Sequence, residues 1–292
     1  MSAITPDAVP VAIGRKPVGY ARFIRRNPTM VAGAVILAFT ILVALFAPLI
    51  AGDPMLKVPS RRLLPPSAEY WFGTDHLGHD VFARTLYGAR VSLIVGISVA
   101  ALSIAIGLFI GLLAGYYRIV DAVVMRLMDG LMSIPAILLA IALVALNRGG
   151  IFIVVAAITI PEVPRVVRLV RSIVLGVREQ PFVEAAIAGG ARQAKIIRRH
   201  IMPSTFSPLI VQATYICASA ILIEASLSFL GAGIPPDIPS WGNMIATSRL
   251  FLARAPWTVF CPALALALVV LAVNLLGDGL RDRLDPRLSR RM

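Results

Sequence analysis

Six long apolar blocks constrain this chain more than any other feature of its sequence. A helix needs about 20 mostly apolar residues to cross the roughly 30 Å hydrocarbon core of a bilayer. The sequence therefore predicts an all-α integral membrane protein with six transmembrane helices. The blocks are Thr29–Ala51, Val91–Tyr117, Val123–Leu146, Ile151–Val170, Ser207–Leu230 and Thr258–Leu280. Composition agrees, because 58% of the residues are hydrophobic and 15% are charged, against about 25% charged in soluble domains.

The positive charge predicts how the chain is oriented in the membrane. Its 28 Lys and Arg residues against 15 Asp and Glu give a net charge of +13. In a soluble protein this excess would suggest nucleic acid, but membrane proteins concentrate Lys and Arg in their cytoplasmic loops. With both termini in the cytoplasm, the inner segments hold 20 of these residues and the outer segments 8. We therefore expect cytoplasmic termini and no nucleic-acid partner.

The expected organisation follows from the blocks and the segments between them. Residues 1–28 form a basic cytoplasmic leader, and residues 29–51 form the first transmembrane helix. That block is too long for a signal-peptide core and shows no cleavage site. Residues 52–90 are extracytoplasmic, residues 91–280 form a five-helix core with a cytoplasmic loop at 178–206, and residues 281–292 form a cytoplasmic tail.

Three polar residues inside apolar blocks are candidates for lining a transport pathway. Glu224 should face protein or water, since a lone charge inside a span costs about 3 kcal/mol or more. Glu162 lies between Pro161 and Pro164 and either borders a water-filled route or meets headgroups at the membrane edge. Asn274 either lines the pathway or makes a hydrogen bond between helices. A different signal, Gly107, Gly111 and Gly115, places three glycines on one helix face that another helix can approach closely.

The basic loop between the fourth and fifth blocks contains the most informative pattern. Pro181 can open a short helix of small residues, and Gly189-Gly190 can end it. A second, basic piece runs from Arg192 to His200, and Pro203 ends it before the fifth block. A short helix of small residues is a surface against which another protein can dock closely. The alternative is a basic amphipathic hairpin lying on anionic lipid.

This loop resembles the signature loop of bacterial ABC-importer permeases. That signature reads E-A-A-x-x-x-G and ends, after a further spacer, in x-L-P. The matching residues are Glu184, Ala185, Ala186, Gly190 and Pro203. The departures are His200 where Ile is usual and Met202 where Leu is usual. The run Arg199-His200-Ile201-Met202-Pro203 is similar to the R-H-I-L-P form of the dipeptide/oligopeptide/nickel permeases.

Further segments extend the resemblance along the chain to the second, "C-type" permease subunit of that family. The first of them carries His79 where the family pattern has Arg. The segments are Phe72–Asp80 (F-G-T-D-x-x-G-R-D in the family), Gly88–Leu93, Glu224–Gly231, Pro239–Gly242 and Leu284–Arg287.

The resemblance implies a type I ABC-importer permease fold and a non-catalytic transport subunit of the bacterial inner membrane, carrying di- or oligopeptides. It also implies a second permease chain, two cytoplasmic ATPase subunits and an extracytoplasmic substrate-binding protein as partners. ATP and Mg²⁺ would be bound by the ATPases, and this chain, which has no G-x-x-x-x-G-K-[ST] phosphate loop, would bind no cofactor. The residues implied in coupling to the ATPase are Glu184, Ala185, Ala186, Gly189, Gly190 and Pro203.

Two other functions stay open at this stage. The chain can be a permease for nickel or another small solute, or it can be a membrane scaffold or channel without ATP coupling. Asp75, His76, His79 and Asp80 are side chains that suit a transition metal. We nevertheless expect no metal site, because turns at Gly73 and Gly78 explain this segment more simply.

Overall fold

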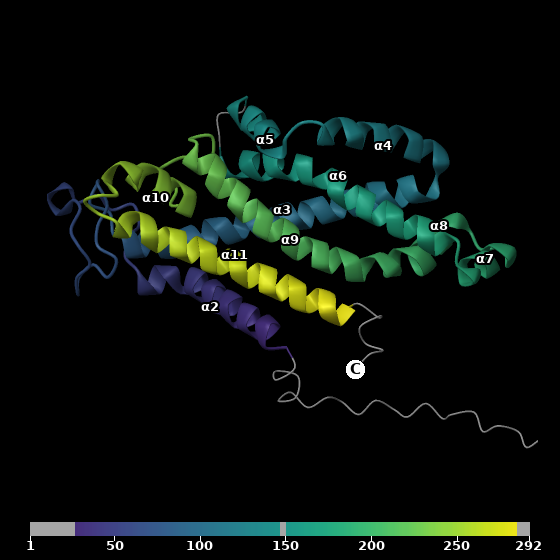
Figure 1. The fold of residues 1–292 in the computed structure, drawn as a ribbon, viewed down its shortest axis with the longest axis horizontal. Coiled ribbons are helices and arrows are strands. Elements are labelled where there is room, and N and C mark those ends of the chain that lie inside the picture. Colours follow the sequence, from purple (N-terminus) through teal and green to yellow (C-terminus); the bar gives the residue numbers. More distant parts are fainter. Residues whose placement is uncertain (1–26, 147–149, 285–292) are drawn as a thin grey trace, which may run out of the picture.

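The computed structural model describes residues 27–146 and 150–284, and most of them are helical (Figure 1). The basic leader, Arg148 and the tail from Asp285 lie outside the described residues. The long helices are α2 (Pro28–Ile50), α3 (Val81–Tyr116), α4 (Arg118–Met132), α5 (Ala136–Ala145), α6 (Ile151–Arg178), α9 (Met202–Phe229) and α11 (Trp257–Leu284). The short ones are α7 (Pro181–Ala188), α8 (Gln193–Ile196) and α10 (Trp241–Ser248). Single turns lie at Pro59–Arg61, Ile197–Ile201 and Arg249–Phe251.

The centre of the bundle is the pair α3 and α6, held together by a ladder of glycines and valines. A Cβ added to Gly107 would lie 2.5 Å from Val166, and one added to Gly115 would lie 2.6 Å from Val174. Gly111 meets Val170 in the same way, at 2.7 Å. The predicted glycine face is thus confirmed, and a valine at every fourth position of α6 fills the space that the missing side chains leave.

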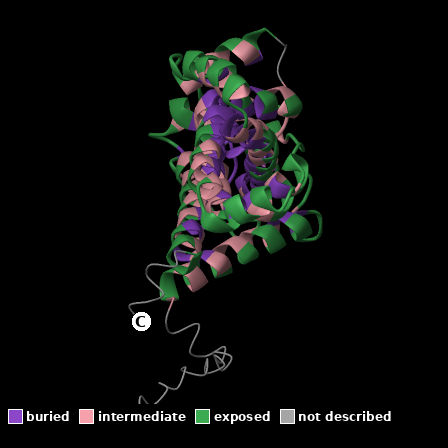
Figure 2. Ribbon diagram, turned by 90° about the vertical axis from the view of Figure 1, so that its right-hand side faces the viewer, coloured by how far each residue is buried: buried purple, intermediate pink, exposed green. Residues whose placement is uncertain are grey.

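The other long helices pack around this pair in two clusters. A larger apolar core joins α3, α5, α6 and α9, and a smaller one joins α2, α3, α9, α10 and α11. In Figure 1, α2 and α11 lie side by side along one flank, and α4 and α5 lie on the opposite flank. Buried residues gather in the middle of the bundle, and exposed ones cover its outer helices (Figure 2).

The third apolar block is not the single span that the sequence predicted. Its two helices, α4 and α5, meet at an angle of 85°. Pro135 precedes α5 as its N-cap residue, and a proline cannot continue a preceding α-helix without losing a hydrogen bond. Within the described residues, four helices are long and apolar enough to cross a membrane, and the bent pair would make a fifth. The all-α membrane fold is confirmed, while the predicted third span is broken and the predicted fourth span, in α6, is not among these candidate helices.

The fourth block, α6, carries more charge than a lipid-facing span tolerates, and its arginines are paired. Arg168 and Arg171 bind Asp129 and Asp121 of α4, with Arg171 Nη2 at 2.7 Å from Asp121 Oδ2. Arg165 pairs with Glu162 on α6 itself. Arg165, Arg168 and Asp129 are exposed, so this charged stripe lies on the outer surface of α4 and α6 in this chain, where the ion pairs partly neutralise it.

Two helix starts differ from the sequence prediction. α3 begins at Val81 rather than Val91, because the Asp80 carboxylate accepts a hydrogen bond from Phe82 N at 2.8 Å and caps the helix. Pro203 does not end the basic segment. It lies in the first turn of α9, where its missing N–H costs little, and a π-helical turn at Ile197–Ile201 makes α8 and α9 one continuous helix.

Candidate functional site

The α7 loop, residues 181–192, projects from one end of the bundle, and α10 with residues 51–80 lies at the opposite end (Figure 1). Gly190 ends α7 in a left-handed conformation, with φ +74°. Its N–H donates to Ile187 O at 2.9 Å, and Ala191 N–H donates to Ala186 O at 3.1 Å. This pair of bonds is a Schellman motif, which favours glycine at the left-handed position. The predicted break at Gly189-Gly190 is confirmed, and Gly190 is the residue that needs to be glycine.

Three apolar side chains anchor the α7 loop to the bundle. Val183 and Ile201 are fully buried, and Ile196 is 1% exposed. A hydrogen bond from Tyr117 Oη to Gln193 Oε1, at 3.2 Å, ties the loop to the end of α3. The sequence reasoning missed these anchors, and the adjacent pair Ile196-Ile197 does not by itself show which isoleucine is buried.

The remaining surface of α7 is bare and composed mainly of small or apolar residues. Phe182 is 49% exposed and Ile187 is 51% exposed. The other exposed residues of this face are Pro181, Glu184, Ala185, Ala188, Gly189 and Gly190, and Ala186 is half-buried. Small residues permit close approach by another backbone, and exposed large apolar residues mark interaction sites. We call these residues, 181–182 and 184–190, the α7 face.

The predicted loop residues do not all lie on this face. Glu184 is in the first turn of α7, where a carboxylate is favoured by the helix dipole. Pro203 is exposed at the start of α9, beyond α8 and the π turn. The structure thus groups Glu184, Ala185, Gly189 and Gly190 on one exposed surface and leaves Pro203 as a helix-start residue.

The three candidate pathway residues have different surroundings. Glu162 is 1% exposed and accepts hydrogen bonds from Arg165 Nη1 at 3.1 and 3.2 Å. Glu224 is fully buried, and Ser228 Oγ donates to its Oε1 at 2.8 Å. Asn274 is half-buried on α11. The two carboxylates therefore contact their own chain in this conformation.

Glu224 belongs to a hydrogen-bond network that fixes the loop between α9 and α10. Ser228 Oγ, which donates to Glu224, also accepts from Ile234 N at 3.3 Å. Asn243 Nδ2 donates to the carbonyls of Ile234 and Pro235 at 2.9 and 3.2 Å. Asn243 was not predicted. Its position directly after the P-S-W-G run was the available signal.

At the same end of the bundle, Asp75 organises the segment before α3. Its Oδ1 accepts from Leu77 N at 2.8 Å and His79 N at 2.9 Å, and its Oδ2 lies 2.7 Å from His79 Nδ1. Burial raises the pKa of Asp75, but the bonds from His79 and Leu77 outweigh burial and hold that pKa below its usual value. Asp75 is thus ionised at neutral pH. Gly73 and Gly78 have φ of +68° and +83°, as expected for turn glycines.

The four possible metal ligands of this segment are engaged in other contacts. Asp75 binds His79, Asp80 caps α3, and the His76 ring stacks on Phe251 with centroids 5.1 Å apart. In the described residues, no three His, Cys, Asp or Glu side chains lie together as a metal site would require.

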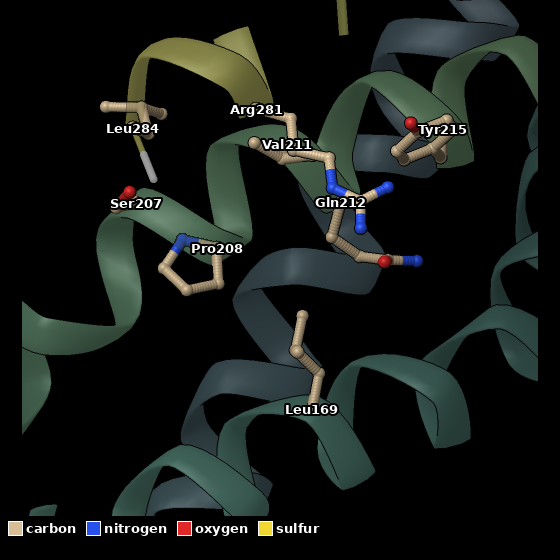
Figure 3. A pocket seen from close by; sticks show the side chains of 8 residues that line it. All are labelled: Leu169, Ser207, Pro208, Val211, Gln212, Tyr215, Arg281 and Leu284. Atoms are coloured by element: carbon tan, nitrogen blue, oxygen red, sulfur yellow. The ribbon is translucent and has the colours of Figure 1, made fainter. Parts of the chain in front are cut away.

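A cavity of about 390 Å³ lies between α6, α9 and α11, in the half of the bundle nearer to the α7 loop. Gln212, Tyr215 and Arg281 give it polar groups, as Figure 3 shows, and Tyr215 Oη donates to Asp278 Oδ1 at 2.6 Å. The remaining lining residues are Leu169, Ser207, Pro208, Val211 and Leu284. Neither Glu162 nor Glu224 is among the residues that line this cavity.

The family is decided by sequence profiles. The profile described as "Binding-protein-dependent transport system inner membrane component" matches residues 103–290. The chain belongs to this family. A second profile, the N-terminal transmembrane domain of oligopeptide transport permease C, matches residues 20–66. The first match covers the α7 loop and the second covers α2, so the chain is a permease subunit along most of its length.

Curated relatives match the permease over nearly its full length. A probable peptide ABC transporter permease protein of Sinorhizobium fredii is 60% identical over 270 residues, which cover 92% of this chain and 93% of the relative. The dipeptide transport system permease protein of Alkalihalophilus pseudofirmus is 45% identical, covering 91% and 88%. The di/tripeptide transport system permease protein of Pseudomonas aeruginosa is 41% identical, covering 90% and 89%.

A solved structure shares the permease fold. The MetNI methionine ABC transporter in an inward-facing form aligns with a TM-score of 0.54 at 20% identity. The alignment covers 69% of this chain and 96% of the solved chain. The likeness confirms the importer-permease fold.

Proposed function

We propose that this permease forms one half of the translocation pathway of an ATP-driven importer for di- and oligopeptides. The peptide substrate is supported by relatives at 41–60% identity whose names specify peptide, dipeptide or di/tripeptide transport. The second half of the pathway comes from another permease chain of similar fold, and an extracytoplasmic binding protein delivers the solute.

The observation that carries the coupling proposal is the bare α7 face. It presents small and apolar side chains to solvent, while Val183 and Ile196 hold the helix rigidly from beneath. A rigid surface with few polar groups loses little hydration when it is buried, so it suits a groove in a partner ATPase. ATP and Mg²⁺ are bound by two such ATPase subunits, since this chain has no phosphate-binding loop of its own.

The orientation proposal follows from the same loop. The α7 loop lies at one end of the bundle, and the start of α2 and the end of α11 are the ends of those helices that lie nearer to it (Figure 1). If the ATPases dock on the α7 face, that end is cytoplasmic, and both termini are too. This agrees with the predicted excess of Lys and Arg in the inner segments.

In the proposed transport step, movement of the ATPase subunits is passed to the permease through the α7 face. Closure of the ATPase dimer pushes on the α7 face, and the continuous α8–α9 helix transmits this push along the bundle. The polar cavity with Gln212, Tyr215 and Arg281 then belongs to the inner opening of the pathway. Glu224, Glu162 and Asn274 remain pathway candidates in the complete assembly, where a second chain adds the missing wall.

Reconstitution tests the substrate and the ATP requirement together. The full assembly, co-purified from native membrane, is placed in vesicles with its binding protein outside and ATP inside. We expect uptake of labelled dipeptides and tripeptides that requires both ATP and the binding protein. Uptake of nickel in place of peptide overturns the substrate assignment, and uptake without ATP overturns the importer mechanism in favour of a channel.

A further inference from the structure

A second cavity, of about 230 Å³, lies at the end of the bundle opposite the α7 loop. Charged and polar side chains from three distant segments line it. They are Lys57, Asp75, His76, His79, Arg84, Asp237 and Thr247, together with Met55, Leu77 and Pro236. We call this space the cap cavity. Its volume is several times the roughly 30 Å³ of one water molecule, so it has room for a functional group of a ligand.

Arg84 is the best-buried cation of the cap cavity, and it is only partly bonded. It is 8% exposed. Its Nη1 lies 2.9 Å from His79 Nδ1 and 3.8 Å from Asp75 Oδ2. Its Nη2 has one long contact, 3.4 Å, to Pro236 O. Within the described residues, Nε has no hydrogen-bond partner although it is buried. One edge of the guanidinium is therefore bonded, and the other, which is enclosed, has almost no hydrogen bonds.

The free edge has the geometry that a carboxylate requires. The Nε–H and Nη2–H donors of arginine form a planar fork that binds the two oxygens of a carboxylate in parallel. A buried donor left without a partner costs free energy, so a ligand that supplies an acceptor here is stabilised. The opposite edge, where Nη1 lies beside His79 Nδ1 and is attracted by the Asp75 carboxylate, fixes the fork in position.

The charges around the cavity balance, with Arg84 and Lys57 opposed by Asp75 and Asp237, so the preference for an anionic acceptor rests on the unpaired donors of Arg84. The oxygens of Asp75 are already engaged by His79 and Leu77, so that carboxylate is not free to bind a cation. Lys57 is exposed at the lining and adds positive charge, opposed by Asp237. Burial lowers the pKa of His76, so its ring is neutral at pH 7, and its buried Nδ1 also has no partner among the described residues.

From this geometry we propose that the cap cavity binds a carboxylate group, held by the Nε/Nη2 edge of Arg84. The proposal rests on the proposed function for the source of that group. Either the free C-terminal carboxylate of a peptide or an acidic side chain of the extracytoplasmic binding protein supplies it. Both sources offer the same chemistry and reach the cavity from the same side.

The test uses the whole permease–ATPase assembly in lipid nanodiscs, with acetate as the probe. Acetate is titrated against chloride at constant ionic strength, and the midpoint of thermal unfolding is followed. We expect acetate to raise the midpoint above the chloride series. Arg84→Lys keeps the charge but lacks the fork, so it should weaken acetate binding about tenfold. The matched control is Arg90→Lys, six residues along the same helix and not part of the cavity lining.

Two further arms separate the sources. Ala-Ala is compared with its C-terminal amide, and the peptide-free binding protein is titrated against wild-type and Arg84→Lys assemblies. A preference for Ala-Ala identifies the peptide as the source, and weakened association of the binding protein identifies its side chain. If Arg84→Lys fails to assemble, Lys57→Gln replaces it, and we expect a few-fold weaker acetate binding.

The proposal is overturned if acetate has no effect beyond chloride, or if the effect persists in the substituted assembly. Acetate binding needs neither ATP nor transport. A negative result here therefore leaves the peptide-importer proposal intact, and a failure of peptide uptake leaves the carboxylate site intact.

Discussion

The two ends of the bundle are built by different means. The α7 face is held by apolar anchors beneath it, and its outer surface is bare. The opposite end, which we call the cap, ties its loops together with side-chain hydrogen bonds through Asp75, Glu224 and Asn243. A surface that must be desolvated by a partner should expose few polar groups, whereas loops that must keep their shape without a partner need internal bonds. The cap is thus self-supporting, whereas the bare α7 face fits the proposal that another chain docks there.

The largest expected effect is on the α7 face. Ala185→Arg adds bulk and charge to an exposed position of α7, so the folded permease should persist while ATPase docking is lost. We expect co-purification of the ATPase and peptide uptake to fall by about 30-fold or more, as for the truncation of an interface hot spot. Gly176→Arg, at an exposed site on α6 with open space around it, is the control. Equal loss in both variants contradicts the docking surface.

A smaller effect is expected at Gly190, where two substitutions distinguish the requirement for a left-handed backbone conformation from the requirement for an uncharged surface. With φ at +74° and no atom near an added Cβ, this position restricts conformation and not volume. Asn and Asp both tolerate the left-handed region better than other residues. Gly190→Asn should therefore retain most uptake, and Gly190→Asp, of similar shape but charged, should lose several-fold more. Uptake and ATPase co-purification unchanged in Gly190→Asp would show that Gly190 does not touch a partner.

A substitution in the cap should lower the stability of the permease and leave ATPase docking unchanged. Asp75→Asn replaces an acceptor with a donor that faces His79 and Arg84, and it should lower stability by about 1–3 kcal/mol. ATPase co-purification should stay at the wild-type level, because the α7 face is at the other end. Thermal unfolding and co-purification are measured on the same sample. Loss of the ATPase at unchanged stability would mean that the two ends are not independent.

The smallest effect is the pH dependence of the cap. The folded pKa of Asp75 lies below its usual 3.8, so its contribution to stability is complete above that value. It is lost as pH falls through the lower, folded pKa. Thermal unfolding between pH 6 and pH 3 should show this loss only below about pH 4, and Asp75→Asn should remove that part of the dependence. A loss centred near pH 6 would assign the effect to another group.

The same contrast explains what the sequence could predict. The α7 loop was readable because its determinants are local. Pro181 starts a helix, Gly190 ends it, and the small residues lie between them. The glycine face of α3 was readable for the same reason, since a spacing of four places residues on one side of a helix. The valines that fill this face lie about 60 residues away and were not foreseen.

The cap cavity was not readable, because some of its contacts join distant segments. Arg84 meets the carbonyl of Pro236, 152 residues later, and no local pattern encodes that pair. The 85° bend between α4 and α5 was also missed, because the hydropathy of a segment reports its composition and not the direction of its helix axis. Pro135 was the visible signal. The charges of α6 suggested cytoplasmic residues, and the pairing of two of its arginines with aspartates of α4 on the bundle surface was not foreseen.

The π-helical turn at Ile197–Ile201 has a consequence for how the permease tolerates changes in chain length. Met202 N–H bonds to Ile197 O, five residues back, so this turn holds one residue more than an α-helical turn. Deleting a single residue there would restore ordinary α-helical bonding and leave the α7 loop in the same rotational register relative to α9. Inserting a residue elsewhere in this 37-residue helix would instead rotate one end against the other by about 100°. The π-helical turn is therefore a position where the chain can lose one residue without changing the direction in which the α7 loop points.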